Sequence, residues 1–149
     1  MQSDQLCASS WRARPRSFVS LMTLYESNFI RLGWVVPDLR RLPAMTVAVA
    51  AGEPPLEIVV HERSRWTTTL ELSCLFDTGG QTERAPRLTV RAYHDARLAE
   101  ACGVAAATPA READVPARRA PDHWRSNMLL NKWLEYCAGR GYQLAPAAS

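Results

Sequence analysis

The stretch Pro86–Cys102, PRLTVRAYHDARLAEAC, decides the fold that we expect for this chain of 149 residues. Its first half alternates apolar with polar residues, the period-two pattern of a half-buried strand over 87–93. In its second half Asp95 stands as an N-cap before residues 96–102, and Gly103 offers a stop. We therefore expect a closing strand followed by a short helix. The residues of the strand that should face the core are Leu88, Val90 and Ala92.

Three further strands precede this stretch, over residues 45–50, 56–62 and 66–76. Each has an apolar side, and turn residues such as Asp77-Thr78-Gly79-Gly80 separate them. Because every connection is short, neighbours in sequence should pair antiparallel as a four-stranded meander. The expected apolar sides are Met45, Val47 and Val49; Leu56, Ile58 and Val60; and Leu70, Leu72, Cys74 and Phe76.

The register of the last hairpin follows from charge and hydrophobicity together. A turn centred near Gln81 would place Glu71 opposite Arg91 and keep every apolar residue on one side. We therefore predict a cross-strand pair between Glu71 and Arg91 on the polar side of the sheet.

Two amphipathic helices should cover the apolar side. One runs from about Ser17 to Leu32, before Gly33, and the other from an Asp122 cap to about Ala138. The fold class is therefore α+β with two layers, in which both helices pack on one face of the sheet. We expect one domain over 17–142, with mobile tails at 1–16 and 143–149 and a flexible Ala/Pro/Arg loop at 104–121.

Composition excludes several classes of protein. No apolar run is long enough to cross a bilayer and no signal peptide is recognisable, so we expect a cytoplasmic protein with no membrane partner. The formal net charge is only +3 and the basic residues, 17 Arg and Lys132, are scattered, so a nucleic-acid partner is not expected. The four cysteines show no metal spacing and are read as core thiols; we expect neither metal nor cofactor. They are Cys7, Cys74, Cys102 and Cys137.

Several segments resemble the YqiB-like family of small proteobacterial proteins of unknown function. The similarity covers roughly Phe18 to Tyr142, and Tyr93-His94-Asp95-Ala96 is its most specific part. The stretch before the last helix departs from the family pattern, and the resemblance implies a family without an activity. The other residues that carry it are Glu26, Asn28, Phe29, Ser64-Arg65-Trp66-Thr67-Thr68, Val90-Arg91, Ala99-Glu100, Trp133-Leu134 and Tyr136-Cys137.

The polar side of the sheet is the candidate site. Threonine hydroxyls, an Arg fork and an aromatic side chain there could hold a small anionic ligand or a protein partner. A bare solvated face would explain the same residues. The function that we expect is a binding or adaptor domain without enzyme activity that uses this face. A small hydrolase using His94 and Asp95 is the alternative, although neighbours on a strand point to opposite faces; RNA binding is the weaker one. The candidate binding residues are Arg65, Thr67, Glu71, Arg91, Tyr93 and His94.

Overall fold

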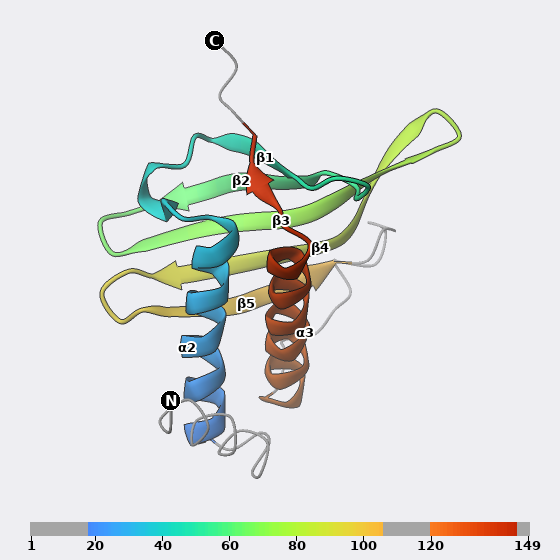
Figure 1. Ribbon diagram of the computed structural model, residues 1–149. Coiled ribbons are helices and arrows are strands. Elements are labelled where there is room, and N and C mark those ends of the chain that lie inside the picture. Colours follow the sequence, from blue (N-terminus) through green and yellow to red (C-terminus); the bar gives the residue numbers. More distant parts are fainter. Residues whose placement is uncertain (1–17, 106–119, 146–149) are drawn as a thin grey trace.

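The computed structural model describes residues 18–105 and 120–145 as a six-stranded antiparallel sheet with two long helices. The strand order is β5-β4-β3-β2-β1-β6, so the first five strands form a meander and the last returns beside the first. Figure 1 shows both helices on the same side of this sheet. The elements are α2 (Phe18–Val35), η1 (Leu39–Arg41), β1 (Met45–Val49), β2 (Leu56–Arg63), β3 (Thr67–Thr78), β4 (Gln81–Tyr93), β5 (Leu98–Ala105), α3 (Ala120–Gly139) and β6 (Gln143–Leu144).

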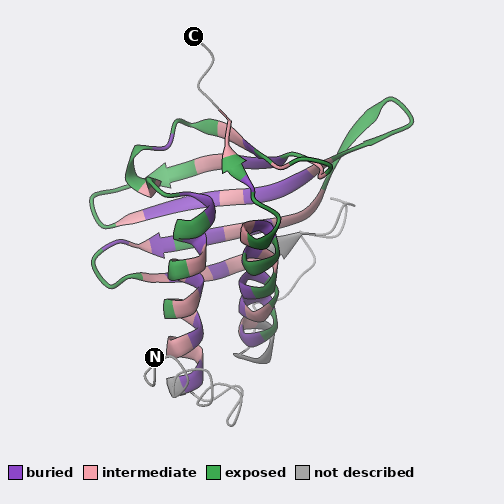
Figure 2. Ribbon diagram, in the orientation of Figure 1, coloured by how far each residue is buried: buried purple, intermediate pink, exposed green. Residues whose placement is uncertain are grey.

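The core lies between the sheet and the helix pair, as the apolar stripes predict. Leu32 and Val35 of α2 and Leu130 and Leu134 of α3 are buried against the sheet, whose central contribution includes Leu72. Figure 2 shows buried and intermediate residues alternating along the strands behind the helices, and the β3–β4 hairpin exposed where it extends past them. Each such buried side chain contributes about 1.5–3 kcal/mol relative to leaving it exposed.

The prediction of a short helix after the fourth strand is wrong. Residues 98–105 form β5, which pairs with β4 from Tyr93↔Leu98 to Arg87↔Ala105. The Ala-rich sequence favours a helix locally, but Ala99 and Ala101 are fully buried under the helices, so tertiary packing overrides that propensity. The sheet therefore has six strands, and Asp95 belongs to a turn, not to a helix cap.

Three buried asparagines fix the helices to the exposed edge of β5. Asn28 donates from Nδ2 to the Ala99 carbonyl at 3.3 Å, and Asn127 accepts from the Ala101 amide at 2.7 Å. Asn127 also accepts from Asn28 at 3.1 Å, and Asn131 donates to Asn28 Oδ1 at 3.0 Å. The amides thus satisfy backbone groups that an edge strand would otherwise leave unpaired.

Several boundaries also differ from the expected ones. The helix α2 continues through Gly33 to Val35, and α3 begins at Ala120, which places Asp122 inside its first turn. In β1 the buried residue is Ala48, while Met45 and Val49 are exposed, so the predicted apolar side of this strand is reversed. Val47 shares the side of Met45 and Val49.

Two further strand predictions change at the chain's C-terminal end and at the β3 bulge. Gln143–Leu144, expected in the tail, form β6 against β1. Phe76 follows the irregularity between Ser73 and Leu75 and is exposed, so it leaves the apolar side of β3. The predicted N-terminal tail, residues 106–119 of the predicted loop, and Cys7 lie outside the described residues.

The third hairpin is two residues out of the predicted register. Glu71 lies opposite Thr89, and Arg91 lies opposite Thr69. The turn is Gly79-Gly80, both with positive φ, so the strands close at Thr78↔Gln81 and not around Gln81. Because the shift is an even number of residues, the side chains of β3 before the bulge between Ser73 and Leu75 keep their predicted face.

Candidate functional site at one end of the open sheet face

The sheet face turned away from the helices, called the open face here, is rich in polar side chains. Residues of β2, β3, β4 and β5 alternate onto it, because successive side chains of a strand point to opposite faces. The helices lie on the other side (Figure 1). The polar residues of this face include Glu57, His61, Thr67, Thr69, Glu71, Ser73, Arg84, Arg87, Thr89, Arg91, Tyr93 and Glu100.

Two arginines of β4 are neutralised by carboxylates on the open face. Arg84 Nε lies 2.7 Å from Glu57 Oε1, and Arg87 Nε lies 2.8 Å from Glu71 Oε2. His61 Nε2 adds a contact of 3.1 Å to Glu71 Oε1. Hydrogen bonding from Arg87 holds the pKa of Glu71 below its ordinary value, although burial opposes this. Glu71 therefore belongs to an internal ion pair, and its predicted partner Arg91 is replaced by Arg87.

Arg91 is different, because its partners are hydroxyl groups. Its Nε lies 3.3 Å from Thr69 Oγ1, and a hydrogen bond with Tyr93 is the first cause of the raised pKa of the guanidinium. Among the described residues no carboxylate lies within ion-pair distance of Arg91. Its side chain is exposed, so the charge of Arg91 is available to a ligand.

A carboxylate between two tyrosines borders Arg91. Tyr93 donates its hydroxyl hydrogen to Glu100 Oε1 at 2.6 Å. Tyr25 of α2 also approaches Glu100; burial first, and then the charge of Glu100, raises the pKa of Tyr25 to about 12. Glu100 was expected inside a helix and was not predicted as a site residue. The alternation of Leu98, Glu100 and Cys102 with small residues is the sequence pattern that could have indicated a strand here, with Glu100 on the same face as Arg91.

The β2–β3 turn lies at the same end of the face as Arg91. Ser64 Oγ accepts hydrogen bonds from the backbone amides of Trp66 and Thr67, at 3.3 and 3.1 Å, which fixes the turn. The Arg65 guanidinium stacks on the Trp66 ring, 4.9 Å from its centroid, and Trp66 is 52% exposed. Thr67 pairs with Tyr93, so this turn and the end of β4 are adjacent.

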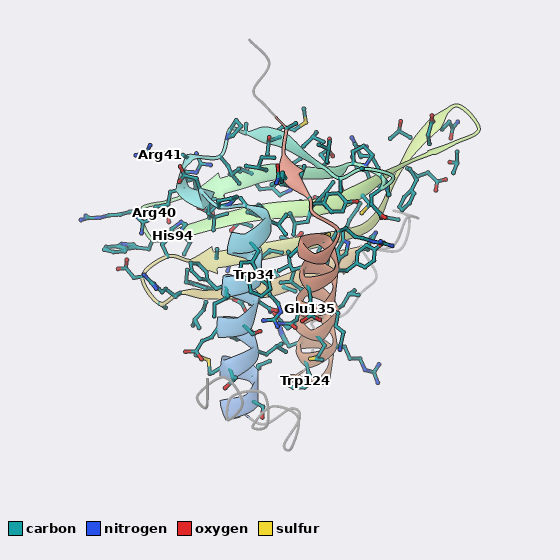
Figure 3. All side chains as sticks on the ribbon, viewed as in Figure 1. Trp34, Arg40, Arg41, His94, Trp124 and Glu135 are labelled. Atoms are coloured by element: carbon teal, nitrogen blue, oxygen red, sulfur yellow. The ribbon has the colours of Figure 1, made fainter. Side chains whose placement is uncertain are left out.

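His94 does not join this group. It is buried on the helix side of the sheet, where its Nε2 lies 2.9 Å from Thr68 Oγ1. Burial first, and then the charge of Arg40, lower the pKa of His94, although the charge of Asp95 opposes this shift. The exposed Asp95 carboxylate instead lies 3.8 Å from Arg40 Nη2. Figure 3 shows Arg40 and His94 near one another at this end. The arrangement is not that of a base held by its carboxylate partner.

The structure thus brings together four of the six predicted residues. Thr67, Arg91 and Tyr93 share the open face, and Arg65 lies in the turn at the same end. Glu71 lies farther along the strand in its own ion pair, and His94 is on the other face. Within residues 18–105 and 120–145, no group of His, Cys, Asp or Glu side chains could hold a metal ion, and no helix could span a membrane.

Comparison with known proteins places the chain in a family. Residues 31–143 match the family described as "Protein of unknown function (DUF1249)", and the chain belongs to it. It is also 28% identical over 139 residues to the uncharacterized protein YqiB of Escherichia coli K12, with 87% of this chain and 94% of the relative covered. The YqiB proteins of the CFT073 and O157:H7 strains match equally. No solved structure matches significantly. The YqiB-like resemblance is therefore confirmed.

Proposed function

We propose that the protein is a binding domain that recognises an anionic group at the end of the open face formed by Arg65, Thr67, Arg91 and Tyr93. The observation that carries this proposal is the pairing of the arginines. Arg84 and Arg87 are held by carboxylates, whereas the side-chain hydrogen bonds of Arg91 within the described part of the chain go to the hydroxyl groups of Thr69 and Tyr93. A guanidinium without a carboxylate partner can donate two parallel hydrogen bonds to a phosphate or carboxylate.

The neighbouring groups support the same ligand class. Threonine and tyrosine hydroxyls can donate hydrogen bonds to anionic oxygens, and exposed Trp66 offers a flat surface for a ring or an apolar group. Glu100 already accepts a hydrogen bond from Tyr93, which weakens its competition with a ligand for the Arg91 guanidinium. The anion can be carried by a small molecule or by a protein partner. We propose that the domain acts in the cytoplasm, as its sequence predicts.

Calorimetry with inorganic pyrophosphate, nucleoside phosphates and sugar phosphates tests the small-molecule source, and capture from lysate tests the protein source. Arg91→Ala should weaken the binding of the ligand found by at least tenfold, and Arg91→Lys less, because Lys keeps the charge but not the fork. Arg125→Ala on α3 is the matched control, because it removes an exposed arginine elsewhere. Equal binding by Arg91→Ala and the wild-type protein would contradict the proposal, as would the absence of any ligand in both assays.

A further inference from the structure

A hollow of about 440 Å³ lies between α2 and the turn that joins β4 to β5. Four of its lining residues occupy successive turns of α2, and the fifth, Arg97, comes from the turn between β4 and β5. Small-molecule sites are usually concave and largely apolar, with a few polar groups that fix orientation. The lining residues are Glu26, Phe29, Ile30, Gly33 and Arg97.

Three of these residues are of types that are unfavourable in their local conformation or exposure. Gly33 is a glycine in the last turn of α2, although a Cβ added there would meet nothing within 4 Å. Arg97 has φ 58°, a left-handed conformation that favours glycine. Ile30 is apolar but 56% exposed. Such departures collect at functional sites, where a side chain or an open space is needed more than local stability.

The charges of the hollow indicate the chemistry of its ligand. Glu26 and Arg97 are both exposed, and neither side chain has a hydrogen-bond or ion-pair partner among the described residues, even though both line one hollow. A carboxylate and a guanidinium beside Phe29 and Ile30 complement a ligand that carries an ammonium group, a carboxylate and an apolar body. A short apolar peptide with free termini has all three.

We propose that this hollow binds a short apolar peptide, with its ammonium group at Glu26, its carboxylate at Arg97 and a side chain against Phe29 and Ile30. Gly33 leaves the floor open for that side chain. The hollow shares no lining residue with the anion site, so Arg91→Ala should leave peptide binding unchanged. This separation lets one proposal fail while the other holds.

Calorimetry of the full chain with the dipeptide leucyl-phenylalanine tests the proposal. We expect saturable binding to the wild-type protein and at least a tenfold loss in Gly33→Leu, which fills the hollow, and in Arg97→Gly, which removes the guanidinium. Neither variant should unfold at a lower temperature than the wild type, because each removes a locally unfavourable residue. This combination separates lost binding from lost folding.

Matched controls and modified peptides complete the test. Gly139→Leu makes the same substitution at the end of α3, where a Cβ is also free of contacts, and should bind as the wild type does. N-acetylation should cancel the contribution of Glu26, and C-terminal amidation that of Arg97. Failure of the wild-type protein to bind the dipeptide would overturn the proposal, and so would undiminished binding by Gly33→Leu or by both blocked peptides.

Discussion

The two ends of the open face use arginine differently. Towards the β3–β4 hairpin, Arg84 and Arg87 are paired with Glu57 and Glu71 at 2.7 and 2.8 Å, and both carboxylates are largely shielded from solvent. At the opposite end Arg91 contacts hydroxyl groups. All three belong to one strand, so residue type does not separate them. The pairing distinguishes the arginines that are held within the sheet from the one that we propose binds a ligand.

The largest expected effect on stability comes from breaking a pair at the hairpin end. Arg84→Ala should lower the free energy of unfolding by about 2 kcal/mol, because it leaves the buried Glu57 carboxylate without its charged donor. Urea denaturation measures this change. The double variant with Glu57→Gln should recover part of the loss, and an Arg84→Ala protein as stable as the wild type would show that the pair contributes nothing.

A smaller effect should appear as a dependence on pH. Hydrogen bonding from Arg87 lowers the pKa of folded Glu71, so this carboxylate stabilises the fold above its unfolded pKa, and the contribution disappears as pH falls through the folded value. The stability advantage of the wild type over Glu71→Gln should therefore shrink as the pH is lowered below about 4.5, the ordinary value for Glu. Urea denaturation in a pH series measures it. An advantage that stays constant down to acid unfolding would refute this role.

The smallest effect is expected at Arg91. Because its side chain is exposed and its partners are hydroxyl groups that water can also satisfy, Arg91→Ala should change the free energy of unfolding by about 0.5 kcal/mol or less. The same urea denaturation, run beside Arg84→Ala, makes the comparison. A loss at Arg91 as large as that at Arg84 would mean that both ends of the face are structural.

Hydrophobic periodicity predicted much of the fold correctly. The alternation in β2 and β4 placed Leu56, Ile58, Leu88 and Val90 in the core, and the helical stripes placed both helices on one face. Periodicity gave a wrong prediction for β5, because its small residues are typical of a helix. In the structure Asn28 and Asn127 bond to the backbone of this edge strand. These contacts join residues far apart in the chain, so no local pattern could reveal them.

The site was predicted less well, for two physical reasons. The face of each side chain follows from strand parity, so Thr67, Arg91 and Tyr93 were assigned correctly to the open face. The pairing of charges depends on the register, which the Gly79-Gly80 turn and the bulge between Ser73 and Leu75 together shift by two residues at Glu71. The hollow beside α2 depends on the approach of Arg97, which only the folded chain defines.

The most direct test of the difference between the two ends is to observe the arginine Nε–Hε groups themselves. In a nitrogen-15 NMR titration with inorganic pyrophosphate, the Arg91 signal should shift and saturate, while the Arg84 and Arg87 signals remain in place because their carboxylates already hold them. Signals of all three that shift alike, or an Arg91 signal that does not respond, would contradict the account.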